Sequence, residues 1–107
     1  MMFPKAKKIK SKKIRDSAKG ESCTIRIPGI CNHDNQTTVF AHVNSRFSGT
    51  ATKSNDIHGV YACSKCHDWM DGRIKSGHSQ SHRERDILRA LIETQMKLIQ
   101  KGLIEVK

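Results

Sequence analysis

The longest regular pattern of apolar and polar positions lies near the end of the chain. Seven positions recur there at helical spacing along one face: Ile87, Leu88, Leu91, Ile92, Gln95, Leu98 and Ile99. Ser81 and Glu84 match a capping box at the start of this pattern, and Gly102 is suited to its end. The pattern predicts an amphipathic helix with a core-facing apolar side and a solvated basic side, followed by a short strand over residues 103–106.

Three shorter stretches have the composition of strands. Residues 36–43 are rich in β-formers, and residues 57–62 form a second such run after a polar excursion. Residues 23–27 alternate apolar and polar side chains, and the Pro28-Gly29 pair that follows predicts a turn. We therefore expect a small sheet before the C-terminal helix, which is an α+β fold.

The length and charge of the chain limit what it can be. A chain of 107 residues with 36% hydrophobic content supports one domain with a small core. Domains of this size commonly need an additional staple, and a bound metal is the expected one here. The net charge of +10 favours a polyanionic partner, DNA or RNA, over the alternative of a soluble protein that is merely basic.

The positive charge is concentrated near the N-terminus, where residues 5–19 hold eight of the twenty lysines and arginines. We expect residues 1–19 to form a flexible arm that lies along phosphates, and residues 20–107 to form the folded domain. The alternative is a tail that only aids solubility. In the arm and beyond it, the side chains expected to contact nucleic acid are Lys7, Lys8, Lys10, Lys12, Lys13, Arg15, Arg46, Lys53 and Arg73.

The sequence shows no feature of a secreted or membrane protein. The N-terminal methionines are not followed by an apolar run of signal-peptide length, and no stretch approaches the length of a membrane span. We therefore expect a cytoplasmic protein that does not contact the membrane. Disulfides are rare in the cytoplasm, so clustered cysteines there indicate metal or redox chemistry.

The four cysteines form a candidate metal site. Cys63 and Cys66 have the Cys-x-x-Cys spacing that directs two thiolates at one point, which is half of a tetrahedral zinc site. Cys23 and Cys31 are farther apart in sequence, and the turn between them brings them together. Four thiolates close the shell around zinc, so such a site is structural. The alternatives are two disulfides, free buried thiols or a redox-active pair.

The sequence resembles the HNH, or ββα-metal (His-Me finger), endonucleases in the order of its elements. These are a strand that ends in His42, a loop, a second strand and a Cys-x-x-Cys-His that opens a helix. Zinc-ribbon members of that superfamily use two cysteine pairs to pin the motif, without a part in catalysis. Within it, the match is closer to a small type of nuclease that prophages encode. The resemblance covers about residues 15–75, and it is carried by residues 23–32, Ala41-His42 and residues 62–68.

The resemblance implies roles for two histidines. His42 matches the general base that acts on the attacking water, and His67 matches the ligand of a catalytic divalent cation. Asp71 follows His67 by one helical turn, which makes it a candidate second ligand for Mg²⁺ or another divalent cation. Each histidine also has a simpler interpretation: His42 as a strand-end residue satisfied by a carbonyl, and His67 as an outer partner of the zinc or a replacement for one cysteine.

One motif position departs from the superfamily. The asparagine expected five residues before the first knuckle cysteine is replaced by His58, and Asn55 and Asp56 lie just upstream. We expect His58 or one of these two residues to fill that position. Otherwise His58, like His78 and His82, is expected to be a surface residue.

Two functions follow from these patterns. The first is a metal-dependent endonuclease of phage or prophage type that hydrolyses DNA phosphodiester bonds. The second is a zinc-finger-like accessory protein that binds DNA or RNA without cleaving it. A catalytic cation near His42 and His67 separates the two functions, because the binding module needs only the structural zinc.

Overall fold

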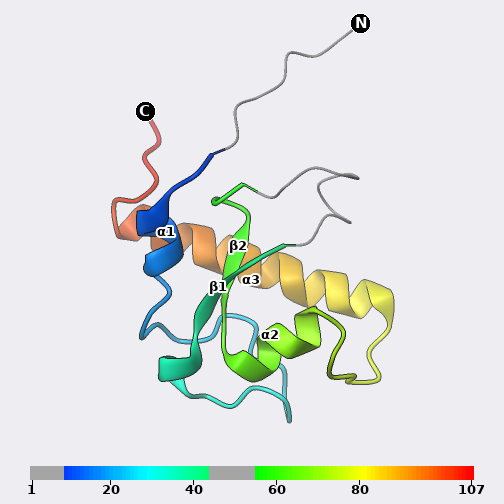
Figure 1. Cartoon of the computed structure of the whole chain (residues 1–107). Helices are drawn as coiled ribbons and strands as arrows, with labels where there is room; N and C mark the ends of the chain where they lie inside the picture. The colour runs from blue at the N-terminus through cyan, green and yellow to red at the C-terminus, as the bar shows by residue number, and fades with distance from the viewer. Residues whose placement is uncertain (1–8, 44–54) are drawn as a thin grey trace, which may run out of the picture.

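A computed structural model describes residues 9–43 and 55–107. These residues form a two-stranded antiparallel sheet with helices around it, so the fold is α+β as predicted (Figure 1). The elements in chain order are α1 (Lys12–Asp16), the short 3₁₀ helix η1 (Asn35–Thr37), β1 (Val39–His42), β2 (Gly59–Ala62), α2 (Ser64–Met70) and α3 (Gln80–Gln100). Among the described residues, no helix is both long and apolar enough to cross a membrane.

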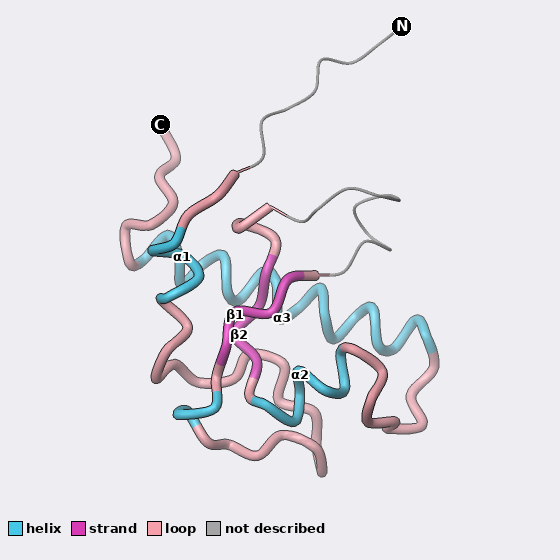
Figure 2. Tube along the Cα trace, viewed as in Figure 1, coloured by secondary structure: helices cyan, strands magenta, loops and turns pink. Residues whose placement is uncertain are grey.

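The two strands pair in a way that places His42 at one end of the sheet. His42 pairs with Gly59, and at the other end Val39 pairs with Ala62. A Cβ atom at position 59 would collide with the ring of Phe40, so glycine fits there without displacing that ring. The chain then enters α2, which turns back and packs against both strands (Figure 2). The order of strand, strand and helix is the one that the sequence predicts.

The long helix α3 packs against β2 and buries a narrower face than the sequence predicts. Its buried residues are Ile87, Ala90, Thr94 and Leu98. Leu88 and Ile92, which we expected in the core, are 56% and 55% exposed. The helix also begins earlier than expected, because Ser79 rather than Ser81 provides the cap through its hydroxyl group.

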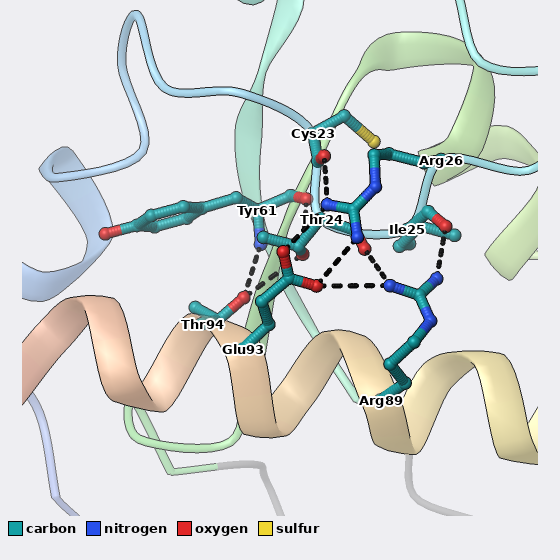
Figure 3. Close-up of polar contacts among 8 residues, drawn as sticks. All are labelled: Cys23, Thr24, Ile25, Arg26, Tyr61, Arg89, Glu93 and Thr94. Atoms are coloured by element: carbon teal, nitrogen blue, oxygen red, sulfur yellow. Dashed lines mark hydrogen bonds and ion pairs between the residues drawn. The ribbon is translucent and has the colours of Figure 1, made fainter.

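The basic side of α3 is not simply solvated surface. Arg89 donates hydrogen bonds to the carbonyl oxygens of Thr24 and Ile25 at 2.9 and 2.6 Å. Glu93 accepts from Arg89 and from Arg26, so this face of the helix is tied to the loop around Cys23 (Figure 3). The expectation of an ordinary solvated face was therefore wrong at these positions.

Two expected strands are absent from the described residues. Residues 23–27 form a bent loop, because Arg26 has a left-handed φ of 53° that interrupts an extended strand. The loop is still fixed to the sheet, since the N–H of Thr24 donates to the carbonyl of Tyr61 at 2.7 Å. Residues 103–106 form no strand either, and the N–H of Leu103 instead donates back to the carbonyl of Leu98.

The folded part of the chain begins before residue 20. Ile14 and Ala18 are buried with Tyr61 and Leu98 in a cluster of their own. Ser17 reinforces this packing, because its hydroxyl lies 2.7 Å from the hydroxyl of Tyr61. The second half of the expected flexible arm is therefore a helix packed on the sheet and on α3. The first eight residues of that arm lie outside the described residues.

Candidate functional site

The four cysteines lie together and are free of disulfide bonds. Their sulfur atoms are all within 4.8 Å of one another, and those of Cys31 and Cys63 are 3.8 Å apart. Four sulfurs at about 2.3 Å from a tetrahedral zinc ion are separated from each other by about 3.8 Å. The cluster therefore fits a metal ion such as zinc, with sulfur as the only ligand element.

Local structure brings the two cysteine pairs together. Cys63 is the N-cap of α2, and its sulfur accepts a hydrogen bond from the N–H of Cys66 at 3.3 Å. The other pair is brought together by the turn at Pro28-Gly29, where Gly29 has a φ of 77° that favours glycine. Cys63 and Cys66 are fully buried, and Cys23 is 5% exposed. Burial and closure of the shell are typical of a structural site.

The thiols of the cluster influence one another. A hydrogen bond from the Cys66 thiol lowers the pKa of the Cys23 thiol to about 4, against the opposing effect of burial. The same bond is the main reason that the pKa of Cys66 is raised. Burial raises the pKa of the Cys31 thiol to about 11. Without a counter-charge, the cluster thus resists carrying four thiolates at once, and a divalent cation supplies that counter-charge.

A second constellation lies at the other end of the two strands, where His42 meets Asp56. Nε2 of His42 is 2.8 Å from Oδ1 of Asp56. The carboxylate can only accept, so Nε2 carries the proton, and Nδ1 is the ring nitrogen that can accept one. The His42 side chain is 35% exposed, which leaves the imidazole within reach of solvent. A histidine held in this way has the arrangement of a general base with an orienting partner.

Asp56 is 4% exposed, and its buried carboxylate is satisfied on both oxygens. Oδ2 accepts a hydrogen bond from the N–H of Ser11 at 2.6 Å and forms an ion pair with Arg15. Burial raises the pKa of Asp56, but the hydrogen bonds from Ser11, His42 and Arg15 and the charge of Arg15 outweigh it and lower the pKa below its usual value. Asp56 is therefore held as an anion beside His42.

His58, Asn55 and Asp56 were the candidates for the middle position of the motif, and among them the side chain of Asp56 contacts the ring of His42. Asn55 instead accepts a hydrogen bond from the N–H of Ile9 at 2.7 Å. His58 forms a backbone hydrogen bond, in which its carbonyl accepts from the N–H of Val43 at 2.9 Å.

The sequence did not predict the partners of Asp56 in and before α1, because residues 9–19 have the composition of a mobile basic arm. Ser11 was the residue that could have indicated a helix there, because it caps α1 through its hydroxyl group.

His67 and Asp71 form a third pair, at the C-terminal end of α2. Nε2 of His67 lies 3.4 Å from Oδ2 of Asp71, and both side chains are partly exposed. The C-terminal end of a helix attracts cations, and an imidazole with a carboxylate can ligate a divalent ion. Arg73 lies 3.3 Å from the same carboxylate and 3.1 Å from that of Asp68.

The residues expected to contact nucleic acid differ in how far they are exposed or already paired with an acidic side chain. Lys10 and Lys13 are exposed. Arg15 is engaged with Asp56, and Arg73 is engaged with the two aspartates of α2 and its C-cap. Lys12 is 3.1 Å from Asp16, in an exposed pair. The others fall outside the described residues: Lys7, Lys8, Arg46 and Lys53.

Comparison with known proteins relates most of the chain to one family. The family profile described as "Putative nuclease YbcO" matches residues 12–103. A protein named "Putative nuclease YbcO" from Escherichia coli (strain K12) is 34% identical over 96 residues, which cover 86% of this chain and 96% of that protein. The "Putative nuclease ybcO" of Enterobacteria phage 82 matches to the same extent.

The fold agrees with this relationship. A solved structure titled "Structure of a putative bacteriophage protein from Escherichia coli str. K-12 substr. MG1655" superimposes with a TM-score of 0.69 at 31% identity, covering 84% of this chain and all of that one. The matched region of the family spans α1, both strands, the four cysteines and α3. The chain therefore belongs to the "Putative nuclease YbcO" family.

Proposed function

We propose that this protein is an HNH-type endonuclease that uses a divalent cation to hydrolyse phosphodiester bonds in DNA. The observation that carries the proposal is the 2.8 Å contact between His42 and the buried carboxylate of Asp56. A buried, fully hydrogen-bonded aspartate that holds one nitrogen of a half-exposed imidazole is the arrangement of a general base. The description of the relatives as nucleases supports the same chemistry.

In the proposed reaction, Nδ1 of His42 takes a proton from water while Asp56 stabilises the imidazolium that forms. The oxygen of that water attacks phosphorus, and the bond from phosphorus to the leaving oxygen breaks. His67 and Asp71 would hold the divalent cation, which supplies positive charge to the phosphate and the leaving oxygen. The two residues suit Mg²⁺ or a transition metal, because one ligand is a carboxylate and the other an imidazole.

The cysteine cluster has a separate task in this proposal. It binds structural zinc through Cys23, Cys31, Cys63 and Cys66, and it thereby fixes the start of α2 and the direction of His67. The Cys63-x-x-Cys66 turn lies directly before His67 in sequence, so a metal bound there would orient that side chain without touching the substrate. The net charge of +10 attracts the DNA backbone, with Lys10 and Lys13 exposed near the N-terminus.

The test is cleavage of supercoiled plasmid, linear duplex, single-stranded DNA and RNA with Mg²⁺, Mn²⁺ or Ni²⁺. We expect nicking of DNA by the parent protein, and we expect His42→Ala to nick it about 10²- to 10⁴-fold more slowly. Met96→Ala is the control, because it alters an exposed side chain of α3 that has no role in the proposed reaction or in the cysteine cluster. If the zinc-loaded parent binds these nucleic acids and cleaves none of them with any cation, the protein is a binding module instead.

A further inference from the structure

Three potential metal ligands lie together at the start of α3, away from the cysteine cluster. The side chains of His78, His82 and Asp86 place their ligand atoms within 4.8 Å of one another. Oδ2 of Asp86 is 3.5 Å from Nε2 of His82 and 4.0 Å from Nδ1 of His78. His82 and Asp86 are one helical turn apart, so they necessarily share a face of the helix. We expected both histidines to be surface residues, and nothing in the proposed reaction uses them.

His78 enters this group from the segment between α2 and α3. Its ring lies against Trp69 with an interplanar angle of 78°, and its backbone N–H donates to the hydroxyl of Ser76 at 3.4 Å. Trp69 is itself fixed, because its indole N–H donates to the same hydroxyl at 2.8 Å and the Arg83 guanidinium lies 4.4 Å from its ring centroid. The position of His78 is therefore imposed by packing.

Nδ1 of His78 is buried and has no hydrogen-bond partner among the described residues. A buried polar atom without a partner costs about 1–3 kcal/mol, so native proteins rarely leave one. The carboxylate oxygen of Asp86 lies 4.0 Å from this atom, which is too far for a hydrogen bond. An ion between the two would satisfy both at once.

We propose that His78, His82 and Asp86 bind a transition-metal ion such as Zn²⁺ or Ni²⁺. Two imidazoles with one carboxylate favour these ions over Mg²⁺, which prefers oxygen ligands. Three protein ligands leave at least one position for water. The negative charge of Asp86 also offsets the unfavourable field that a cation meets near the N-terminus of a helix.

Binding requires a modest contraction of the site. Ligands at about 2.0–2.1 Å from a tetrahedral ion lie about 3.4 Å apart, against separations of up to 4.8 Å here. The rings of His78 and His82 are stacked with centroids 4.1 Å apart, so one ring must turn to point its nitrogen at the ion. His82 is free to make this movement, because its side chain is 40% exposed and lies at the helix surface. Once bound, the ion would fasten the segment before α3 to the helix.

The experiment uses full-length His67→Ala protein that already holds one zinc per chain, so that neither the cysteines nor the proposed catalytic ligands compete. Calorimetric titration with NiCl₂ should show one further equivalent. Adding Asp86→Asn or His82→Ala should weaken that binding at least about tenfold. Glu84→Gln is the matched control, since it removes the same charge from the same helix outside the cluster, and it should leave the affinity unchanged.

A second readout keeps the test independent of activity. Ni²⁺ should raise the thermal midpoint of the His67→Ala protein and of its Glu84→Gln version, but not that of the Asp86→Asn version, because only a folded, intact site binds the ion. The proposal is overturned if no further equivalent binds, or if Asp86→Asn and His82→Ala bind it as tightly as the control. In that case the three side chains form an ordinary ion-pair cluster at the helix start.

Discussion

Oδ1 of Asp56 lies 2.8 Å from Nε2 of His42, while the other oxygen of the same carboxylate receives Ser11 and Arg15. One buried anion therefore joins the end of β1 to the start of α1. Asp56 and Arg15 are 41 positions apart in sequence. The orientation of the proposed general base thus depends on a helix that is remote from it in the chain.

The first prediction concerns this carboxylate. Asp56→Asn should slow DNA cleavage, because an amide cannot stabilise the imidazolium and can present its N–H group to the ring instead of its oxygen. Loss of the base itself in His42→Ala should cost about 10²- to 10⁴-fold, and the Asp56→Asn effect should be smaller. Single-turnover cleavage of a labelled duplex, alongside a binding assay, measures both quantities.

A positioning role predicts that Asp56→Asn lowers the cleavage rate while DNA affinity and zinc content stay at the parent values. His58→Ala is the comparison, because the hydrogen bond that the backbone carbonyl of His58 accepts from Val43 is kept in the variant. If His58→Ala is the more damaging of the two, His58 rather than Asp56 supports the reaction.

The second prediction is a dependence of stability on pH. The pKa of Asp56 is lower in the folded protein than its ordinary value of 3.8, because the hydrogen bonds from Ser11, His42 and Arg15 and the charge of Arg15 outweigh burial. The folded state therefore favours the carboxylate. The resulting stabilisation is fully present at a pH above the ordinary pKa of Asp56, and it is lost as the pH falls through the lower pKa that Asp56 has in the folded protein. Asp56→Asn should thus be less stable than the parent at neutral pH.

The measurement is urea unfolding of the parent and Asp56→Asn at a series of pH values. Both proteins keep the same cysteines, so loss of metal in acid affects them alike and cancels in the difference. That difference should shrink below pH 3.8. A difference that is constant with pH would mean that the amide disturbs packing rather than removing a charge.

The sequence predicts the parts of the molecule that depend on short-range spacing. The Cys63-x-x-Cys66 turn forms from neighbouring residues, and Gly29 marks the turn that brings the other cysteine pair together. The strand order and the position of His42 at a strand end also follow from local pattern. These features depend on residues that are close together in the sequence.

What the sequence does not predict depends on distant contacts. Ile14 is a single apolar residue among lysines, and only the presence of Tyr61 and Leu98 opposite it makes α1 part of the core. Arg26 continues an alternating strand pattern in the sequence, yet its bidentate pairing with Glu93 of α3 accompanies a left-handed backbone. Neither partner is recognisable from the residues around it.

The third prediction distinguishes the two halves of the expected basic arm. Deleting residues 1–8 removes three lysines and should leave the fold intact, because the contacts that the structure describes for Ile9 and the residues after it all remain. The slope of log affinity against log salt should fall by about 0.9 for each phosphate that the deleted lysines neutralise. Deleting residues 1–19 should also unfold or destabilise the protein, since it removes Ile14 and Arg15.

Circular dichroism and salt-dependent DNA binding separate these outcomes. An unchanged slope after deletion of residues 1–8 would identify that segment as a solubilising tail. A stable fold after deletion of residues 1–19 would contradict the role of α1 in the core.

The fourth prediction concerns the cysteine cluster. The protein should contain one zinc per chain when purified without added metal, and Cys63→Ser should lose it and fold poorly. The substitution removes a zinc ligand, while the serine hydroxyl can still cap α2 in place of the sulfur. A core of this size cannot replace the folding free energy of a metal site. Metal analysis with thiol titration checks this, and two disulfides with no zinc would overturn it.

The last prediction uses two buried threonines as a matched pair. The hydroxyl of Thr94 lies 3.1 Å from that of Thr24 and 3.2 Å from the backbone nitrogen of Tyr61, so it links α3 to the sheet and to the loop that carries Cys23 (Figure 3). Thr94→Val preserves the shape but leaves buried partners without this oxygen, which should cost about 1–3 kcal/mol in the free energy of unfolding.

Thr38 is equally buried, at 3% exposed, but its hydroxyl has no partner among the described residues. Thr38→Val should therefore be neutral or stabilising, because it replaces an unsatisfied polar atom with a methyl group of similar volume. Urea midpoints of the two variants against the parent measure the difference directly. Equal destabilisation by both substitutions would show that volume and packing, rather than the hydrogen bonds of Thr94, hold α3 against the sheet.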